Sequence, residues 1–277
     1  MTTGRLIVCA TPIGNLGDIS ERLRSALASA DLVFAEDTRR VAKLLAHLGL
    51  TPPVLSLFTG NEQARSQQLL EAVGSGQTVA LVSDAGTPVI SDPGAGAVRS
   101  VREAGYAVSV IPGPSAVTSA VALSGFEGDR FVFEGFLPRR GAERADRLAQ
   151  IGLEPRVVVL FASPNRLAAD LEGLAGVSDP GRQVAVMREL TKVHEEVWVG
   201  TLEEAVSRWE APVKGEVTVV LGPSPQQPPS LDDAVTEARR LLSEGNTVSE
   251  AARIVSEGLG VSRRRVYETL IRDQESS

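Results

Sequence analysis

The pattern of apolar residues in this 277-residue chain predicts an α/β fold with two α/β domains and a small helical C-terminal domain. In residues 1–124, short apolar runs alternate with segments whose apolar residues recur three and four positions apart, as in buried strands joined by amphipathic helices. In residues 125–222, strand-like runs follow one another with fewer helices, which indicates a mixed sheet. Residues 231–277 carry no strand pattern and predict two or three short helices.

The first domain is predicted to contain strands at 6–10, 32–36, 54–57, 79–83 and 107–111. Its helices are predicted at 19–30, 38–48, 61–73 and 91–104. Side chains that can cap a helix N-terminus stand near three of these helix starts, namely Asp18 or Ser20, Asp37 and Ser91.

The second domain is predicted to contain strands at 131–135, 156–161, 184–188, 195–200 and 216–221, with helices at 141–151, 165–175 and 202–210. The segment PSPQQPPS (223–230) has four prolines in eight residues and predicts a linker. The tail beyond it has the pattern of a helix-turn-helix: Ala251, Ala252 and Ile254 on one helix, a turn at 258–260, then Val266 and Leu270 on the next.

Composition indicates a globular protein of the cytoplasm. The longest apolar runs are far shorter than the roughly twenty residues of a membrane helix, and the N-terminus lacks the apolar stretch of a secretory signal. A single cysteine, Cys9, excludes an internal disulfide, and two distant histidines give no metal-ligand cluster, so no metal is expected. The net charge of −7 argues against a general nucleic-acid coat but allows a local basic surface.

Four loops rich in Gly and Pro are the strongest functional signal from the residues themselves. TPIGNLGD (11–18), SDAGTPVISDPG (83–94) and PGPSA (112–116) each follow a predicted strand, and KGE (214–216) precedes one. Because ligands bind at the carboxyl ends of strands in open α/β sheets, these loops predict a small polar ligand held largely by backbone groups. They match neither a phosphate-binding loop nor the G-x-G-x-x-G dinucleotide pattern.

The ordered series of motifs resembles the ribosomal RNA methyltransferases of the tetrapyrrole-methylase superfamily, the class III methyltransferases. The motifs are TPIGNLGD, FAEDTRR (34–40), LVSDAGTPVISDPG (81–94), IPGPSA (111–116), EGFLPRR (134–140), RELTKVHE (188–195) and KGEVTVVLG (214–222). The resemblance covers essentially the whole chain. It implies a homodimer with S-adenosylmethionine in a cleft between two α/β domains. The implied reaction is 2′-O-methylation of a cytidine ribose in the decoding region of 16S rRNA, alone or in the small ribosomal subunit.

The same resemblance assigns the cofactor contacts by motif. They are Pro12, Gly86, Thr87, Pro88, Val89, Ile90, Ser115, Ala116, Leu160, Phe161, Ala162, Gly215 and Val217. The chain departs from the family pattern in two places. Relatives commonly carry Glu where this chain has Ala162 and His where it has Asn165, and they tend to carry His just before the Asn-Glu pair, where it has Thr59 and Gly60.

The transfer itself requires an alignment of the two reactants and a group that accepts the hydroxyl proton. Glu36, Lys214 and Glu216 are the predicted catalytic residues. Structural alternatives stay open beside them: Asp37 can simply cap a helix, and Lys214 and Glu216 can form an ordinary ion pair.

RNA contacts require positive charge, and the predicted ones are Arg39, Arg139, Arg140, Arg263, Arg264 and Arg265. Arg144 and Arg147 extend the cluster around Arg139. The structural alternatives are a surface ion pair for Arg39 and a solvated helix face for the three consecutive C-terminal arginines.

Two other functions compete with rRNA methylation. One is a methyltransferase for a corrinoid, another tetrapyrrole or a protein on the same scaffold. The other is a regulator that senses a small ligand and binds DNA through its C-terminal helices. The C-terminal helices and arginine clusters count against the first of these, because a tetrapyrrole substrate needs neither.

Overall fold

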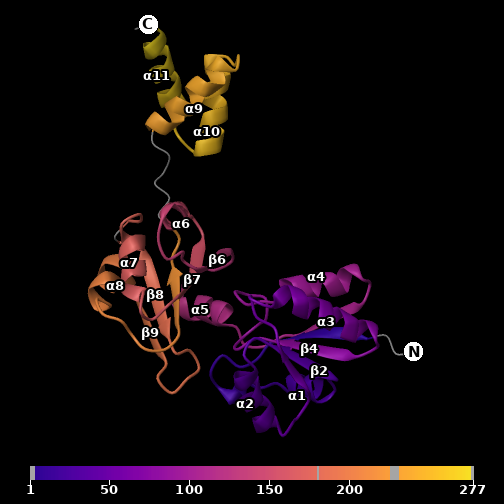
Figure 1. Cartoon of the computed structure of the whole chain (residues 1–277). Coiled ribbons are helices and arrows are strands. Elements are labelled where there is room, and N and C mark those ends of the chain that lie inside the picture. Colours follow the sequence, from indigo (N-terminus) through magenta and orange to yellow (C-terminus); the bar gives the residue numbers. More distant parts are fainter. Residues whose placement is uncertain (1–3, 180, 225–230, 276–277) are drawn as a thin grey trace. The chain divides into compact units, whose positions relative to one another are not determined.

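The computed structural model describes residues 4–179, 181–224 and 231–275. The chain forms two compact units, one ending at Ser224 and the other made of the residues that follow. The first unit contains both predicted sheets and the second contains only helices (Figure 1). The predicted α/β class with a helical C-terminal domain is therefore confirmed. Residues 225–230, most of the predicted linker, lie outside the described residues.

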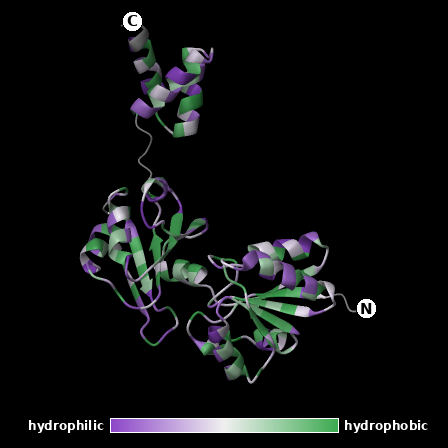
Figure 2. Cartoon of the chain, in the orientation of Figure 1, coloured by the Kyte–Doolittle hydropathy of each residue, from purple (hydrophilic) through white to green (hydrophobic). Residues whose placement is uncertain are grey.

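A five-stranded parallel sheet forms the N-terminal half of the first unit, in the order β3-β2-β4-β1-β5. Its strands are β1 (Arg5–Cys9), β2 (Leu32–Ala35), β3 (Val54–Ser56), β4 (Thr78–Val82) and β5 (Ala107–Ile111). The central strands are almost entirely apolar because helices cover both of their faces (Figure 2).

Two helices cover each face of this sheet. Helices α1 (Glu21–Ala28) and α2 (Thr38–Leu48) pack on one face, and α3 (Glu62–Gly74) and α4 (Ala95–Glu103) pack on the other (Figure 1). Local sequence explains the limits of α2: the Asp37 side chain caps its first turn, and Gly49 ends it in the left-handed region at φ 69°.

The expectation that Ser91 caps a helix was wrong. Helix α4 begins only at Ala95, after Gly94 as N-cap, and Ser91 lies in the preceding loop at φ 62°. The reason is Pro93, which disfavours helical backbone at Asp92 and so delays the helix start.

The second sheet is mixed, in the order β6-β7-β10-β8-β9. Its strands are β6 (Phe131–Phe136), β7 (Val157–Ala162), β8 (Gln183–Arg188), β9 (Glu196–Thr201) and β10 (Val217–Leu221). Strands β6 and β7 are parallel, and the other neighbours are antiparallel. Helices α6 (Ala142–Leu153), α7 (Leu167–Ala175) and α8 (Leu202–Arg208) pack on one face.

Helix α5 (Ala116–Ser124) was not predicted, and it packs on the opposite face of this second sheet. The domain boundary placed after residue 124 assigns this helix to the first domain, although Val117 and Ala120 pack against β7, β8 and β10. Ile13, from the loop after β1, joins the same apolar cluster. This cluster therefore joins the two sheets directly beside the converging loops.

The second unit is a three-helix domain of α9 (Leu231–Ser243), α10 (Val248–Leu259) and α11 (Arg263–Glu275). Ala251, Ala252, Val266 and Leu270 are buried in its small core, as expected. Ile254, which was expected in this core, is 39% exposed, and its neighbour Val255 is buried there instead. Thr247 and Glu250 form a capping box at the start of α10, and Gly260 ends it at φ 67°.

Candidate active site

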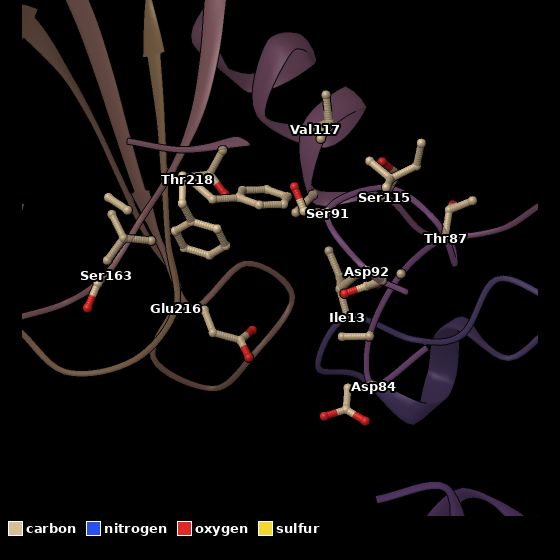
Figure 3. Close-up of a pocket in the computed structure, with 18 of the residues that line it drawn as sticks. Ile13, Asp84, Thr87, Ser91, Asp92, Ser115, Val117, Ser163, Glu216 and Thr218 are labelled. Carbon is tan, nitrogen blue, oxygen red and sulfur yellow. The ribbon is translucent and has the colours of Figure 1, made fainter. Parts of the chain in front are cut away.

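A cavity of about 560 Å³ lies where loops of the first sheet meet the second sheet. Figure 3 shows Asp84, Thr87 and Asp92 on one side of it and Glu216 and Ser163 on the other. Many of the predicted site residues line it: Glu36, Gly86, Thr87, Ile90, Ser115, Ala116, Phe161, Ala162, Gly215, Glu216 and Val217. Its volume falls within the roughly 300–1,000 Å³ of small-molecule sites.

Five of the predicted catalytic and cofactor-binding residues are not among those lining the cavity: Pro12, Pro88, Val89, Leu160 and Lys214. Leu160 is buried in the apolar core beneath α6 and α7, because side chains alternate along β7 and the neighbouring Phe161 points to the opposite face, toward the cavity. The Lys214 carbonyl accepts a hydrogen bond from Arg188 at 2.9 Å, and its side chain is exposed.

The loop after β4 is fixed and strained. Gly86 exchanges two backbone hydrogen bonds with Thr11, at 2.9 and 3.1 Å, which joins this loop to the loop after β1. Gly86 itself has φ 77°, where glycine is favoured, but Val89 and Ser91 also have positive φ, at 77° and 62°. A β-branched residue in this region is uncommon and costs about 1–3 kcal/mol, and such strain concentrates at binding sites.

Three carboxyl groups form an acidic edge of the cavity: Glu36, Asp84 and Asp92. The carboxyl groups of Glu36 and Asp92 lie close enough to affect each other's pKa. Burial, with the negative charges of Asp92 and Asp84, raises the pKa of Glu36. Burial and Asp84 likewise raise the pKa of Asp92, against the lowering effect of a hydrogen bond from Ser83.

The site assignment from sequence missed Asp84 and Asp92. Asp84 accepts a hydrogen bond from the Asp37 backbone at 2.9 Å and lies 3.4 Å from Nε of Arg40, which fixes it beside the end of β2. Both aspartates belong to the SDAGTPVISDPG segment, next to its glycines and prolines. Their position after the strand was the available signal.

We expect Asp92→Asn to stabilise the protein near pH 8 relative to wild type. An acid whose pKa is raised in the folded state holds its proton more tightly there, so stability falls as pH rises from the ordinary carboxyl range through the raised pKa. The amide that replaces this carboxyl cannot ionise, so the variant does not lose this stability at high pH. Its gain over wild type should shrink near pH 4.5, where the wild-type carboxyl is largely protonated. Thermal melting of the ligand-free protein measures it, with the exposed Asp146→Asn as the control. Equal gains at both pH values would contradict the assignment.

Aromatic rings form the apolar wall on the second sheet. Phe136 and Phe161 line the cavity, and their ring centroids lie 5.5 Å apart. Phe136 is 59% exposed, although large apolar side chains are usually buried. This residue was also missed, and its signal was its place in the EGFLPRR motif.

Glu216 projects into the cavity from the start of β10 (Figure 3). Its partner is Lys192, not the neighbouring Lys214: Nζ of Lys192 lies 3.0 Å from Oε2 of Glu216 and 2.7 Å from Oε1 of Glu189. Burial disfavours the Lys192 ammonium, but these two hydrogen bonds outweigh it and raise the pKa of Lys192. The hydrogen bond from Lys192 lowers the pKa of Glu189.

The arginines predicted to bind RNA are exposed and lie outside the cavity lining. Arg39 forms a surface ion pair with Asp37 at 2.7 Å, and the Asp37 side chain also caps α2. Both residues thus have the structural roles that were open as alternatives. Arg144 is not part of a free basic cluster, because it pairs with Asp170 at 2.7 Å. Arg147 pairs with Glu134 in the same way.

Two arginine side chains fix the backbone next to Arg139 and Arg140 by hydrogen bonds to its carbonyls. Arg144 donates to the carbonyl of Pro138 at 3.2 Å, and Arg166 donates to the carbonyl of Arg139 at 3.0 Å. The side chains of Arg139 and Arg140 are exposed.

In the second unit, Arg263, Arg264 and Arg265 occupy the first turn of α11 and are exposed. Arg264 donates to Glu268 at 2.7 Å, and Arg263 donates to the Ser249 hydroxyl at 3.1 Å. Surface pairs of this kind contribute at most about 1 kcal/mol, so they leave the arginines available to a phosphate.

Among the described residues, no group of three or more His, Cys, Asp or Glu side chains is arranged to hold a metal ion. Likewise, the described helices include none with the length and apolar character needed to cross a membrane.

Comparison with known proteins identifies the family. Residues 5–206 match the family model described as Tetrapyrrole (Corrin/Porphyrin) Methylases. Ribosomal RNA small subunit methyltransferase I of Mycobacterium bovis is 43% identical over 100% of this chain and 98% of its own. The protein of the same name from Thermotoga maritima is 46% identical over 79% of this chain and 98% of its own.

A solved structure shares the fold of this chain. It is uroporphyrin-III C-methyltransferase from Thermus thermophilus, complexed with S-adenosylhomocysteine. It is 18% identical with a TM-score of 0.57, covering 79% of this chain and 97% of that chain. The chain thus belongs to the tetrapyrrole (corrin/porphyrin) methylase family, in its branch of small-subunit ribosomal RNA methyltransferases I.

Proposed function

We propose that this protein transfers a methyl group from S-adenosylmethionine to the 2′-hydroxyl of a cytidine ribose in the decoding region of 16S rRNA. The observation that carries the proposal is the 43% identity, over the full chain, to a relative named for methylation of small-subunit rRNA. We further propose that the protein acts in the cytoplasm on 16S rRNA or on the small ribosomal subunit.

The charges around the cavity fit the donor. S-adenosylmethionine supplies a methyl group on a positively charged sulfur, and it carries an ammonium and a carboxylate as well. The acidic edge of Glu36, Asp84 and Asp92 favours the two positive groups. Ser115 and Ala116 line the cavity at the N-terminus of α5, where backbone N–H groups favour a carboxylate. Phe136 and Phe161 offer apolar ring surface to the adenine.

Gly86 supports the same assignment by its shape. A Cβ built on this residue would lie 3.4 Å from Cγ2 of Ile13 and 3.7 Å from the carbonyl of Pro114, at a φ that side chains rarely adopt. Both neighbours belong to the other loops that converge here. A bare backbone at Gly86 therefore leaves room for a ligand to approach the loop closely.

A direct test offers the purified protein and labelled S-adenosylmethionine to naked 16S rRNA and to 30S subunits. Mass analysis of nuclease fragments should place the label on a cytidine ribose. Transfer only to a tetrapyrrole or to protein would instead support a methyltransferase that acts on one of those substrates. Tight binding of duplex DNA without any transfer would support the regulator.

The three arginines at the start of α11 are expected to dock the RNA. Replacing Arg263, Arg264 and Arg265 together by Ala should raise the KM for RNA and flatten its dependence on salt, because phosphate contacts release counterions. The kcat should stay near the wild-type value. The Thermotoga maritima relative is matched over 98% of its own length by only 79% of this chain, so that relative is shorter and has no counterpart to about a fifth of this chain. A fall in cofactor affinity instead would contradict this role.

We also propose that the protein is a homodimer. Val197 and Val199 on the edge strand β9 are 41% and 46% exposed, and a second copy would cover this apolar surface. Sedimentation should give twice the chain mass of 29.2 kDa, and a species of single-chain mass would contradict the proposal.

A further inference from the structure

Lys192 lies on the loop between β8 and β9, which has an unusual backbone. Glu189 and Thr191 have positive φ, at 50° and 68°, and neither is glycine. The buried Oγ1 of Thr191 has no hydrogen-bond partner in the described part of the chain. Such strain persists only where surrounding structure imposes it.

Two glycines of the sequence motifs make room for this loop. A Cβ on Gly14, in the loop after β1, would overlap Cγ of Lys192. A Cβ on Gly215, at φ 89°, would overlap Cγ and Cδ of Glu189. The absence of side chains at these two glycines therefore leaves the space that the side chains of Lys192 and Glu189 occupy.

The Lys192 ammonium connects two glutamates of different exposure. Glu189 is largely buried and is held from both sides, since its Oε1 accepts hydrogen bonds from Nζ of Lys192 at 2.7 Å and from the Glu216 backbone at 2.8 Å. The side chain of Glu216 is 59% exposed and lines the cavity. Its Oε2 accepts from Lys192 at 3.0 Å, which fixes the carboxylate by one oxygen.

Among the side-chain hydrogen bonds of the described residues, none reaches the other oxygen, Oε1 of Glu216. The chain has three lysines, and Lys43 and Lys214 are both exposed. Lys192 is one-quarter exposed and does not line the cavity. Glu216 is the cavity-lining residue to which its ammonium donates.

We infer that Lys192 is a positioning residue that holds Glu216 so that its second oxygen accepts the proton of the attacking ribose hydroxyl. The inference rests on the proposed function. In the transfer, the ribose oxygen forms a bond to the methyl carbon while the carbon–sulfur bond breaks, and that electron pair stays on sulfur as a neutral thioether. The hydroxyl proton passes to the Glu216 carboxylate and from there to water.

The test combines Lys192→Met, Lys192→Arg, Glu216→Gln and the double variant Lys192→Met/Glu216→Gln. Each is assayed for kcat and KM with rRNA, and its cofactor affinity is measured by calorimetry. Glu216→Gln should lower kcat by about 100-fold or more, as loss of a proton acceptor does. Lys192→Met should lower kcat by about 10–100-fold, because a misplacement near 1 Å has effects of this size. Cofactor affinity and KM should change less than about twofold on the same reasoning.

The double variant separates positioning from an independent role. If Lys192 acts through Glu216, the double variant is no slower than Glu216→Gln alone, and Lys192→Arg recovers most of the activity. The exposed Lys43→Met is the matched control and should keep wild-type kinetics.

Three results would overturn the inference: an unchanged kcat in Lys192→Met, multiplicative losses in the double variant, or a loss of cofactor binding that explains the lower rate. A wild-type protein that binds the cofactor but methylates no rRNA would instead overturn the proposed function itself.

Discussion

Gly86→Val is expected to abolish binding of S-adenosylmethionine while the protein remains folded. Gly86 lines the cavity at φ 77°, and a side chain there would approach Ile13 and enter the space opposite Pro114. Valine is β-branched and disfavours this φ, so the loop would also shift. We expect affinity to fall by at least about 100-fold, or roughly 2.7 kcal/mol. Calorimetry measures the affinity, and circular dichroism checks the fold.

Gly105→Val is the matched control for this substitution. Gly105 also has positive φ, at 81°, but a Cβ there meets nothing within 4 Å, and the residue lies outside the cavity lining. It should carry a similar backbone strain and keep cofactor affinity. Wild-type affinity in Gly86→Val, or equal losses in both variants, would contradict the place of Gly86 in the site.

Arg182→Met is expected to lower the free energy of unfolding more than any other substitution considered for this protein. The guanidinium is buried, with only 1% of the residue exposed, and it donates to main-chain carbonyls at the end of α6 and after β10. Three of these bonds, to Gly222, Ile151 and Glu154, measure 2.9, 2.8 and 3.1 Å. Burial lowers the pKa of Arg182 to about 10, yet the group stays charged at neutral pH.

Methionine fills a similar volume but leaves these carbonyls without their charged donor. Because each hydrogen bond to a charged group contributes about 1.5–3 kcal/mol and the bonds are not additive, we expect a loss on the order of 3 kcal/mol. Urea unfolding measures it, and the exposed Arg99→Met should change stability by less than about 0.5 kcal/mol. An Arg182→Met protein as stable as the control variant would mean that the buried charge contributes nothing net.

The sheets could be predicted because most of their strands are apolar runs bounded by turn residues. Strand β5 and helix α2 begin and end where the sequence placed them, since caps and glycines set their limits. Helix α5 escaped prediction because it is apolar on most of its surface and shows little helical periodicity. One side of the helix packs on the second sheet through Val117 and Ala120, whereas Leu123 is 46% exposed.

The site was predictable only as far as local motifs reach. The loops of Gly86, Ser115 and Gly215 were found because Gly and Pro mark them, and all three line the cavity. The partner of Glu216 was not found, because sequence proximity favoured Lys214 and only the fold brings Lys192, 24 residues away, to that carboxylate. Glu36 and Asp92 likewise line one cavity although they follow two different strands, β2 and β4.

The cavity between the two sheets is proposed to bind a methyl donor. The most direct test is calorimetric titration of the intact wild-type protein with S-adenosylmethionine and with its demethylated product. We expect saturable binding of both, one molecule per chain. A correctly folded protein that binds neither would contradict it.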